Sequence, residues 1–307
     1  MGQDYATLRV PASTSNLGAG FDTFGLALNL YNYFTAQPWD RWEFEIEGEG
    51  QELPKNEENL FARVYLKACE LFSQKPIPLK VKMKNHIPTA RGLGSSATAI
   101  VSAIKLWEHF YQRTLSLEER LRIAFEFEPH PDNLLPALLG GFLVCAVGER
   151  VHYQRLDFPE ELKVVVCIPN FELSTKKARE VLRQEVSLKD AVYNIQRASL
   201  LVASLCKRDY QALRSAVKDR LHQPYRKSLI PNFERVLESA YSEGALAVFL
   251  SGAGPTIASF CLEGEDRIGS AMVYAFQEVG ISAKYLSLKV DKEGAIFTTA
   301  PASGGQV

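Results

Sequence analysis

Apolar and polar residues follow two periodicities along the chain, and together these predict a mixture of strands and helices. Alternating side chains or short apolar runs predict strands over residues 7–12, 26–34, 42–47, 79–85, 164–168, 245–250, 257–260 and 283–288. Apolar residues three and four positions apart predict helices over residues 59–72, 97–111, 117–127, 188–205, 231–241 and 269–278. A hydroxyl followed by cations at Ser174 predicts one further helix start.

The stretch 88–98 reads Pro-Thr-Ala-Arg-Gly-Leu-Gly-Ser-Ser-Ala-Thr and leads directly into a predicted helix. A helix N-terminus presents free backbone N–H groups and about half a positive charge, which attract anions. Gly92 and Gly94 place no Cβ in the way of such an anion. An ordinary helix cap would have a similar sequence, because serine caps helices and glycine forms turns. The adjacent hydroxyls of Ser95 and Ser96 favour a phosphate or metal-phosphate site.

A second polar loop, 128–133, reads Glu-Pro-His-Pro-Asp-Asn. Its prolines restrict the backbone, so Glu128, Asp132 and Asn133 present three oxygen-bearing side chains from a constrained loop. Oxygen ligands of this kind suit Mg²⁺, which commonly takes one or two carboxylates together with phosphate oxygens. The alternative is that Asp132 or Asn133 caps the helix that follows. His130 alone is no metal site.

Two further loops are rich in small residues. Residues 11–22 contain two glycines and end in Phe21 and Asp22, and residues 251–256 read Ser-Gly-Ala-Gly-Pro-Thr. Loops of this kind can hold a polar ligand close to the backbone, although a simple connection would look the same.

Composition narrows the class of protein. The length of 307 residues suits two domains, and 46% apolar with 23% charged residues is typical of a globular chain. A net charge of −1 gives no reason to expect a nucleic acid or a membrane as partner. The five cysteines are isolated, and the sequence shows no apolar signal segment. We therefore expect reduced cysteines and a cytoplasmic location.

Other nucleotide-binding motifs fit less well. Residues 92–97 match a dinucleotide fingerprint, which needs a strand running into the glycines and an acidic residue about 20 positions later. Here Pro88 and Arg91 intervene, and Glu118 lies in a predicted helix. The sequence also lacks a Gly-Lys-Ser P-loop and the protein-kinase motifs.

The motifs together resemble those of the GHMP kinases, named for galactokinase, homoserine kinase, mevalonate kinase and phosphomevalonate kinase. The family's central loop corresponds to residues 88–97 and its third motif to residues 251–256. Four stretches resemble the homoserine kinases within this family: 11–22, 128–139, 173–182 and 222–231. Ala19 stands where proline is usual, and Pro129 replaces a glycine.

The resemblance implies an α+β fold with the active site between two domains. We expect an N-terminal ATP-binding domain over residues 1–150, similar to the second domain of ribosomal protein S5, and a C-terminal ferredoxin-like domain over residues 151–307. The implied reaction is transfer of phosphate from ATP, with Mg²⁺, to the hydroxyl of L-homoserine, a step of threonine biosynthesis. Relatives often form homodimers.

The resemblance also implies site residues. ATP would be bound by Asn59, Pro88, Arg91, Gly92, Leu93, Gly94, Ser95, Ser96, Ala97 and Thr98. Mg²⁺ would be held by Ser96 and Glu128, with Glu126 close by as an alternative. The substrate would be bound by Asn16, Asp22, His130, Arg179, Arg226 and Gly252, and the catalytic residues would be Asp22, Asn133 and Arg226.

These residue types suit an amino-acid substrate. Arg179 and Arg226 can form a two-point clamp for a carboxylate, and Asp22 can bind the ammonium group or the hydroxyl. Asn133 stands where several GHMP kinases place an aspartate base, so in-line transfer would depend mainly on positioning. Three alternatives stay open. Each arginine could lie on a solvated helix face, the substrate could be another alcohol such as mevalonate, or the chain could be a non-catalytic sensor of nucleotide or amino acid.

Overall fold

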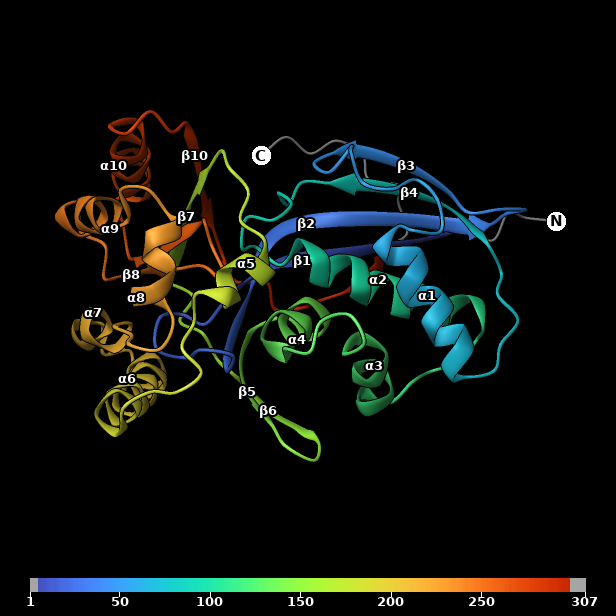
Figure 1. Cartoon of the computed structure of the whole chain (residues 1–307), viewed down its shortest axis with the longest axis horizontal. Coiled ribbons are helices and arrows are strands. Elements are labelled where there is room, and N and C mark those ends of the chain that lie inside the picture. Colours follow the sequence, from blue (N-terminus) through green and yellow to red (C-terminus); the bar gives the residue numbers. More distant parts are fainter. Residues whose placement is uncertain (1–4, 299–307) are drawn as a thin grey trace.

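The computed structural model describes residues 5–298, which form two β-sheets side by side, each covered by helices (Figure 1). The first sheet has the order β11-β1-β2-β4-β3, and the β5–β6 hairpin joins the start of β2. Its strands are β1 Ala6–Ser15, β2 Phe24–Pro38, β3 Glu43–Gly48, β4 Leu79–Asn85, β5 Phe142–Val147, β6 Val151–Leu156 and β11 Ile296–Thr298. The pair β3–β4 is parallel, and the other pairs of this sheet are antiparallel.

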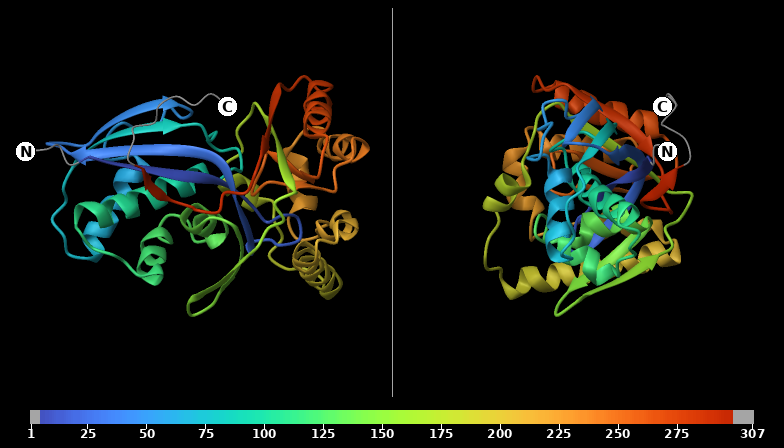
Figure 2. Two further views of the ribbon diagram at one scale, coloured as in Figure 1. Left: turned by 180° about the vertical axis from the view of Figure 1, so that it is seen from behind. Right: turned by 90° about the vertical axis from the view of Figure 1, so that its right-hand side faces the viewer.

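The helices of the first domain lie on one face of this sheet (Figure 2). They are α1 Leu60–Leu71, α2 Ser95–Phe110, α3 Leu117–Ala124 and α4 Pro131–Leu139. In β4, Val81 and Met83 are buried while Lys82 between them is exposed, because successive side chains of a strand point to opposite faces. Ile100 and Trp107 of α2 enter the same core.

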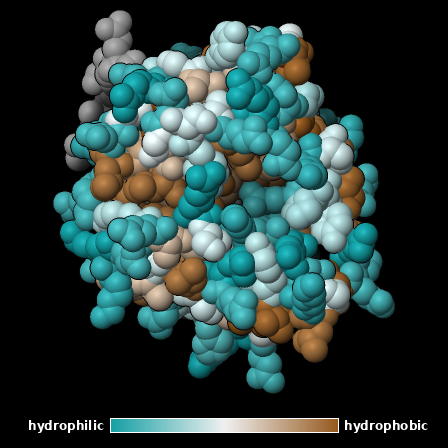
Figure 3. Space-filling model, turned by 90° about the vertical axis from the view of Figure 1, so that its left-hand side faces the viewer, coloured by the Kyte–Doolittle hydropathy of each residue, from teal (hydrophilic) through white to brown (hydrophobic). Residues whose placement is uncertain are grey.

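The second sheet has the antiparallel order β10-β7-β9-β8. Its strands are β7 Lys163–Pro169, β8 Ala247–Leu250, β9 Ile257–Cys261 and β10 Ala283–Leu288. The larger helices around it are α6 Leu188–Lys207, α9 Phe233–Ser242 and α10 Glu265–Gln277, and shorter turns are α5 Thr175–Glu180, η1 Tyr210–Ala212, α7 Leu213–Ala216, α8 Gln223–Arg226 and η2 Lys227–Leu229. The outward face of this layer is mainly polar, with apolar residues in separate small patches (Figure 3).

The two sheets share a hydrophobic core. Ala12, Leu17 and Leu26 from the β1–β2 region pack in one cluster with Val164 of β7 and Phe249 of β8. The central strand β7 is apolar from Val164 onward because both of its faces are covered. The packing holds the two domains together, so loops that leave the shared core at its edge have fixed relative positions.

The predicted periodicities correspond to observed elements. The strand expected over 79–85 has those bounds, and the helix expected over 97–111 begins two residues earlier. The predicted α+β fold in two domains is confirmed by both sheets. The sequence did not reveal the β5–β6 hairpin or β11.

The division at residue 150 stays a prediction. Strand β6, over residues 151–156, pairs with β5 in the first sheet, and β11 returns to pair with β1. The pairing therefore favours a change of sheet between β6 and β7, with the last described strand belonging to the first domain.

Candidate active site

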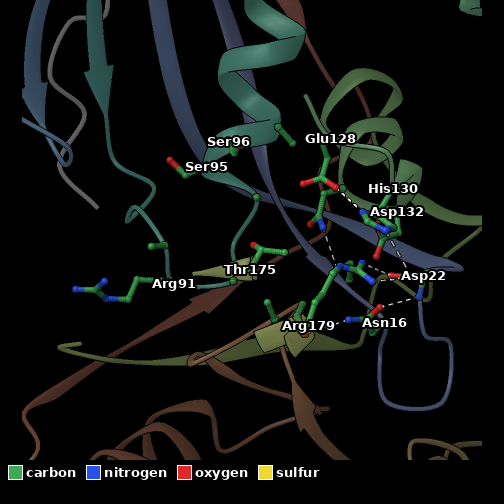
Figure 4. A pocket seen from close by; sticks show the side chains of 18 of the residues that line it. Asn16, Asp22, Arg91, Ser95, Ser96, Glu128, His130, Asp132, Thr175 and Arg179 are labelled. Carbon is green, nitrogen blue, oxygen red and sulfur yellow. Dashed lines mark hydrogen bonds and ion pairs between the residues drawn. The ribbon is translucent and has the colours of Figure 1, made fainter. Parts of the chain in front are cut away.

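A cavity of about 100 Å³ opens where the two domains meet (Figure 4). Six separated segments contribute to its wall: the β1–β2 loop, the loop before α2, the start of α4, helix α5, helix α8, and the loop after β8. Its lining residues are Ser15, Asn16, Asp22, Ala90, Arg91, Gly92, Gly94, Ser95, Ser96, Ala97, Glu128, His130, Asp132, Asn133, Thr175, Arg179, Arg226, Gly252 and Ala253. The sequence motifs, far apart along the chain, therefore surround one space.

The N-terminus of α2 faces this cavity. Gly94 is its N-cap residue with φ 73°, and no side chain caps the helix within the described residues. The ordinary serine cap is therefore not what the structure shows. A Cβ on Gly94 would lie 2.2 Å from Ser13 Oγ, so both the positive φ and the close approach require glycine. The first N–H groups of a helix have no intrahelical acceptor, and here they belong to Ser95, Ser96 and Ala97.

Hydrogen bonds between loops fix the glycine-rich turn. Ser251 Oγ donates to the carbonyl of Gly92 at 2.6 Å, and Ser13 N donates to the carbonyl of Leu93 at 3.1 Å. Gly252 N donates in turn to the carbonyl of Ser15 at 3.1 Å. The third motif and the end of β1 thus hold the central loop before any ligand binds.

Some residues predicted to bind ATP lie behind the cavity rather than in its wall. Leu93 is buried in the shared core, and Thr98 Oγ1 donates to the carbonyl of Ser95 at 2.7 Å. Pro88 is buried beneath the turn. Arg91 lines the rim but extends away from the acidic groups (Figure 4), and its Nη1 lies 3.5 Å from Glu172.

A chain of charged side chains crosses the other wall. Asp22 accepts from Nη1 and Nη2 of Arg179 at 3.1 and 2.7 Å. Nε2 of His130 lies 3.9 Å from Asp22, and its Nδ1 lies 2.7 Å from Oε1 of Glu128. Four predicted site residues from three segments are therefore neighbours in space (Figure 4).

Asn16 fixes the loop that carries Asp22. Its Nδ2 donates to the carbonyl of Gly252 at 3.0 Å, and its Oδ1 accepts from the backbone N–H of Asp22 at 2.9 Å. Both Asn16 and Asp22 have positive φ, 70° and 53°, which asparagine and aspartate tolerate better than most residues. The side chain of Asn16 therefore connects the first and third motifs.

Arg226 is 1% exposed at the end of α8, so it does not lie on a solvated helix face. Nε donates to the carbonyl of Ala178 and Nη1 to the carbonyl of Gly252, both at 3.1 Å. Burial lowers the pKa of Arg226 to about 10, so the group still carries its charge at neutral pH. The ring of Phe21 faces both guanidinium groups, with its centroid 5.3 Å from Cζ of Arg226 and 5.4 Å from Cζ of Arg179.

The first turn of α4 brings two polar side chains to the cavity. The helix begins at Pro131 after His130, and neither Asp132 nor Asn133 acts as its cap. Asn133 Oδ1 accepts from Ser13 Oγ at 2.9 Å, and Nδ2 donates to Ser15 Oγ at 3.0 Å. Asn133 is thereby held in one orientation.

The sequence predicted for Asp132 only that its side chain offers an oxygen atom from a constrained loop. It is 3% exposed, and its Oδ1 has no hydrogen-bond partner among residues 5–298. Burial, reinforced by the nearby charge of Asp22, raises the pKa of Asp132 to about 7. Ser15 and Thr175 also line the cavity and were not predicted, because single hydroxyl residues carry no distinctive sequence signal.

The side chains around the cavity fit a single Mg²⁺ bound with phosphate. Ser96 and Glu128 line the same space, and Glu128 gives one carboxylate oxygen to His130, so the second can be offered to a cation. The side chain of Glu126 is 52% exposed and pairs with Lys67 at 3.7 Å. The part of the chain that the structure describes has no cluster of three or more acidic, His or Cys ligands, which suits an ion that takes most of its ligands from phosphate and water.

A second cavity, of about 270 Å³, adjoins the first at Ala90, Ser95 and Ser96. Apolar side chains form most of its wall: Phe34, Leu53, Pro54, Leu60, Met83 and Ala99. Three asparagines, Asn32, Asn59 and Asn85, also line it. Asn59 was predicted to bind ATP, and it lies here rather than in the polar cavity.

No helix within residues 5–298 is long and apolar enough to cross a membrane.

The family profile described as GHMP kinases N terminal domain matches residues 59–141, and the profile described as GHMP kinases C terminal matches residues 201–277. A homoserine kinase of Aquifex aeolicus is 50% identical over 289 residues, which cover 94% of this chain and 97% of that protein. The chain belongs to the GHMP kinase family.

Similar proteins extend the agreement to almost the whole chain. A homoserine kinase of Persephonella marina is 48% identical over 94% of this chain and 96% of its own length. The crystal structure of homoserine kinase from Cytophaga hutchinsonii aligns with a TM-score of 0.87 at 27% identity, covering 97% of this chain and 98% of that one. The resemblance predicted from the motifs is confirmed, and membership of this kinase family implies use of ATP.

Proposed function

We propose that this chain is a homoserine kinase, which transfers phosphate from Mg²⁺-ATP to the hydroxyl of L-homoserine and forms O-phospho-L-homoserine for threonine biosynthesis. The observation that carries the proposal is the cavity itself, in which an anion-binding helix terminus faces two arginines and an aspartate. Relatives that match this chain over nearly their full length are homoserine kinases. We place the enzyme in the cytoplasm because all five cysteines are free thiols.

The α2 side of the cavity suits the triphosphate. Backbone N–H groups of Ser95, Ser96 and Ala97 point outward from the helix, and the adjoining apolar cavity has the position and character for a purine base. Ser96 and Glu128 would hold Mg²⁺, which would neutralise charge on the transferring phosphate. Among the residues predicted to bind ATP, the best supported are those of the turn and helix start that line the cavity: Gly92, Gly94, Ser95, Ser96 and Ala97.

The opposite wall suits an amino-acid zwitterion. Asp22 and Arg179 already form a close ion pair, and a zwitterion can replace that contact by two others, ammonium with Asp22 and carboxylate with Arg179. Arg226, fixed by backbone carbonyls, supplies a second positive charge without moving. Mevalonate has a carboxylate but no ammonium group, so it would leave Asp22 without its cationic partner.

Positioning supplies most of the catalysis in this scheme. The side-chain amide of Asn133 does not ionise and so cannot act as a base, and it is held by Ser13 and Ser15. Phosphoryl transfer tolerates a weak base because its transition state is largely dissociative. Asp22 is the carboxylate we assign to receive the proton of the substrate hydroxyl, and Asn133 and Arg226 orient the reactants.

The decisive experiment is ADP release with Mg²⁺-ATP and a panel of L-homoserine, L-serine, L-threonine, mevalonate and galactose. Turnover with L-homoserine, and little with the other alcohols, is the expected result. Turnover with mevalonate would move the chain to another branch of the family. Binding of ATP or homoserine without turnover of any alcohol would indicate a sensor. A homodimer stays a prediction, which sedimentation of the pure protein would test.

A further inference from the structure

The apolar cavity beside Ser95 and Ser96 contains three asparagines, and two of them have their side chains fully engaged. Asn32 Oδ1 accepts from the backbone N–H groups of His86 and Ile87, and its Nδ2 donates to Thr98 Oγ1. Asn59 Oδ1 accepts from Phe61 N at 3.0 Å, and its Nδ2 donates to the Pro54 carbonyl at 2.7 Å. These two asparagines therefore hold the cavity wall together.

Asn85, the last residue of β4, is different. It is 5% exposed, and its Nδ2 donates to the carbonyl of Glu49 at 3.0 Å. Its own carbonyl accepts from the backbone N–H of Glu49 at 3.0 Å. A reversed amide would bring two oxygens together at Glu49, so the orientation of the side chain is determined.

That orientation leaves Oδ1 of Asn85 as a buried acceptor. It has no hydrogen-bond partner anywhere in residues 5–298, although Asn85 lines the cavity. Buried acceptors are almost always paired, and leaving one unpaired is unfavourable. An occupant of the cavity that brings an N–H donor to this oxygen would remove the penalty.

The surroundings define the donor. Phe34, Leu60 and Met83 offer apolar surface for a flat ring, and the phosphate-binding helix terminus begins beside it at Ser95. Adenine carries an exocyclic 6-amino group, which donates, whereas guanine and hypoxanthine carry a 6-oxo group, which accepts. A 6-oxo purine would place two acceptors face to face at Asn85.

We propose that Oδ1 of Asn85 accepts a hydrogen bond from the 6-amino group of adenine and so makes the site select adenine nucleotides. The inference rests on the proposed function in that it takes the cavity as the base-binding part of an ATP site. It adds the residue that reads the base. Asn85 is a specificity residue and takes no part in phosphoryl transfer.

The test compares nucleotides that differ only at position 6 of the purine. Calorimetry on the full chain would measure the affinities of ADP, purine riboside 5′-diphosphate, which has hydrogen at that position, and IDP. We expect the wild type to bind ADP about tenfold or more tightly than either analogue, because a site built to hydrogen-bond a group rejects ligands lacking it. In Asn85→Ala and Asn85→Ser the ratio of ADP to purine riboside diphosphate should fall towards one.

Each variant is compared with itself, so a general loosening of the β3–β4 connection lowers both affinities and leaves their ratio unchanged. The matched control is Asn56→Ala, because Asn56 is exposed and lies in the loop between β3 and α1 without lining the cavity. It should keep the wild-type ratio. If the variants at Asn85 fail to fold, the wild-type comparison alone decides.

Equal binding of ADP and purine riboside diphosphate by the wild type would overturn the inference. An unchanged ratio in the Asn85 variants would do the same, and would leave Asn85 only as a tether for Glu49. Selective ADP binding without phosphorylation of homoserine would refute the proposed function while the assignment of Asn85 stands. Phosphorylation of homoserine without discrimination at position 6 of the purine would support the proposed function and refute the assignment of Asn85.

Discussion

Asp22 and Arg179 come from different domains and form a two-point ion pair, with oxygen–nitrogen distances of 2.7 and 3.1 Å. Both side chains are partly exposed, and such pairs contribute little to stability, on the order of 1 kcal/mol or less. Before substrate arrives the two charges satisfy each other. The site therefore holds its anion-binding and cation-binding groups ready without a large electrostatic strain.

Asp22→Asn should separate binding from stability. We expect the KM for homoserine to rise about 100-fold or more, because the ammonium group loses its charged partner. We also expect kcat to fall, because Asp22 is the assigned acceptor of the hydroxyl proton. The free energy of unfolding should change by no more than about 1 kcal/mol. Steady-state kinetics measure KM and kcat, and urea unfolding measures the stability. A large loss of stability with an unchanged homoserine KM would show that the pair serves only to join the domains.

Arg226→Ala should affect both substrate binding and stability. The KM for homoserine should rise far more than that for ATP, because Arg226 faces the amino-acid wall. The variant also leaves the carbonyl of Ala178 without its donor from Arg226, at about 1–3 kcal/mol for an unpaired buried group. The carbonyl of Gly252 keeps its second donor, Asn16 Nδ2. Equal effects on both KM values would contradict a carboxylate clamp.

Glu128→Gln should weaken the binding of the Mg²⁺ that accompanies the nucleotide. We expect the Mg²⁺ concentration needed for half-maximal ADP binding to rise about tenfold or more, because removing a carboxylate weakens the hold on a hard cation. Glu126→Gln is a close control, two residues away and on the surface, and should behave as the wild type. The reverse result, with Glu126→Gln impaired, would transfer the metal site to that residue.

Asp132 should make the protein less stable as the pH rises. Burial raises its pKa to about 7, whereas an aspartate in the unfolded chain ionises at about pH 3.9. Between these values the folded state holds a proton that the unfolded state releases, so stability falls across that window. At pH 8 Asp132→Asn should raise the free energy of unfolding by about 2–4 kcal/mol. An equal gain at pH 4 and pH 8 would contradict this account.

His222 should have the opposite pH dependence. Its Nε2 lies 2.8 Å from the Gly18 carbonyl, which can only accept, so this nitrogen carries the hydrogen. Nδ1 then accepts from Arg226 Nη1 at 3.2 Å. Burial lowers the pKa of His222 against the opposing charge of Asp219, and the positive charge of Arg226 adds to the lowering.

Because the unfolded histidine takes up a proton at about pH 6.5 and the folded one resists it, stability should fall as the pH drops below that value. Urea unfolding from pH 8 to pH 5 in the Asp132→Asn background, where the opposite contribution of Asp132 is absent, measures the fall. His222→Gln keeps a hydrogen-bonding side chain and cannot titrate, so its stability should depend less on pH in this range. A slope equal to that of Asp132→Asn alone would assign the acid sensitivity to other groups.

Periodicity predicted most of the fold because most elements bury one regular face. In β4 the alternation is strict, and its bounds were predicted correctly. The β5–β6 hairpin was missed because the apolar run of β5 closely follows the apolar residues of α4 and does not stand apart from them. Strand β6 is largely exposed and does not alternate clearly. Three-residue β11 carries too little pattern to be recognised, and only its pairing with β1 makes it a strand.

For the candidate site, the sequence predicted most of the residues that line the cavity, but it did not predict which of them contact one another. The motifs pointed to Asp22, His130 and Arg179, but a contact between segments so far apart depends on how the domains pack. The raised pKa of Asp132 depends on burial by neighbours from several elements. The unpaired oxygen of Asn85 follows from what Glu49 does on the adjacent strand, which no local spacing encodes.

The return of β11 to the first sheet has a consequence for biosynthesis. Thr7 at the start of β1 pairs with Thr298, so that edge of the first sheet cannot close until residue 298 has left the ribosome. Until then β1 presents an unpaired backbone edge to other nascent chains. Completion of the first sheet therefore waits until residues 296–298, far along the chain from β1, have been translated.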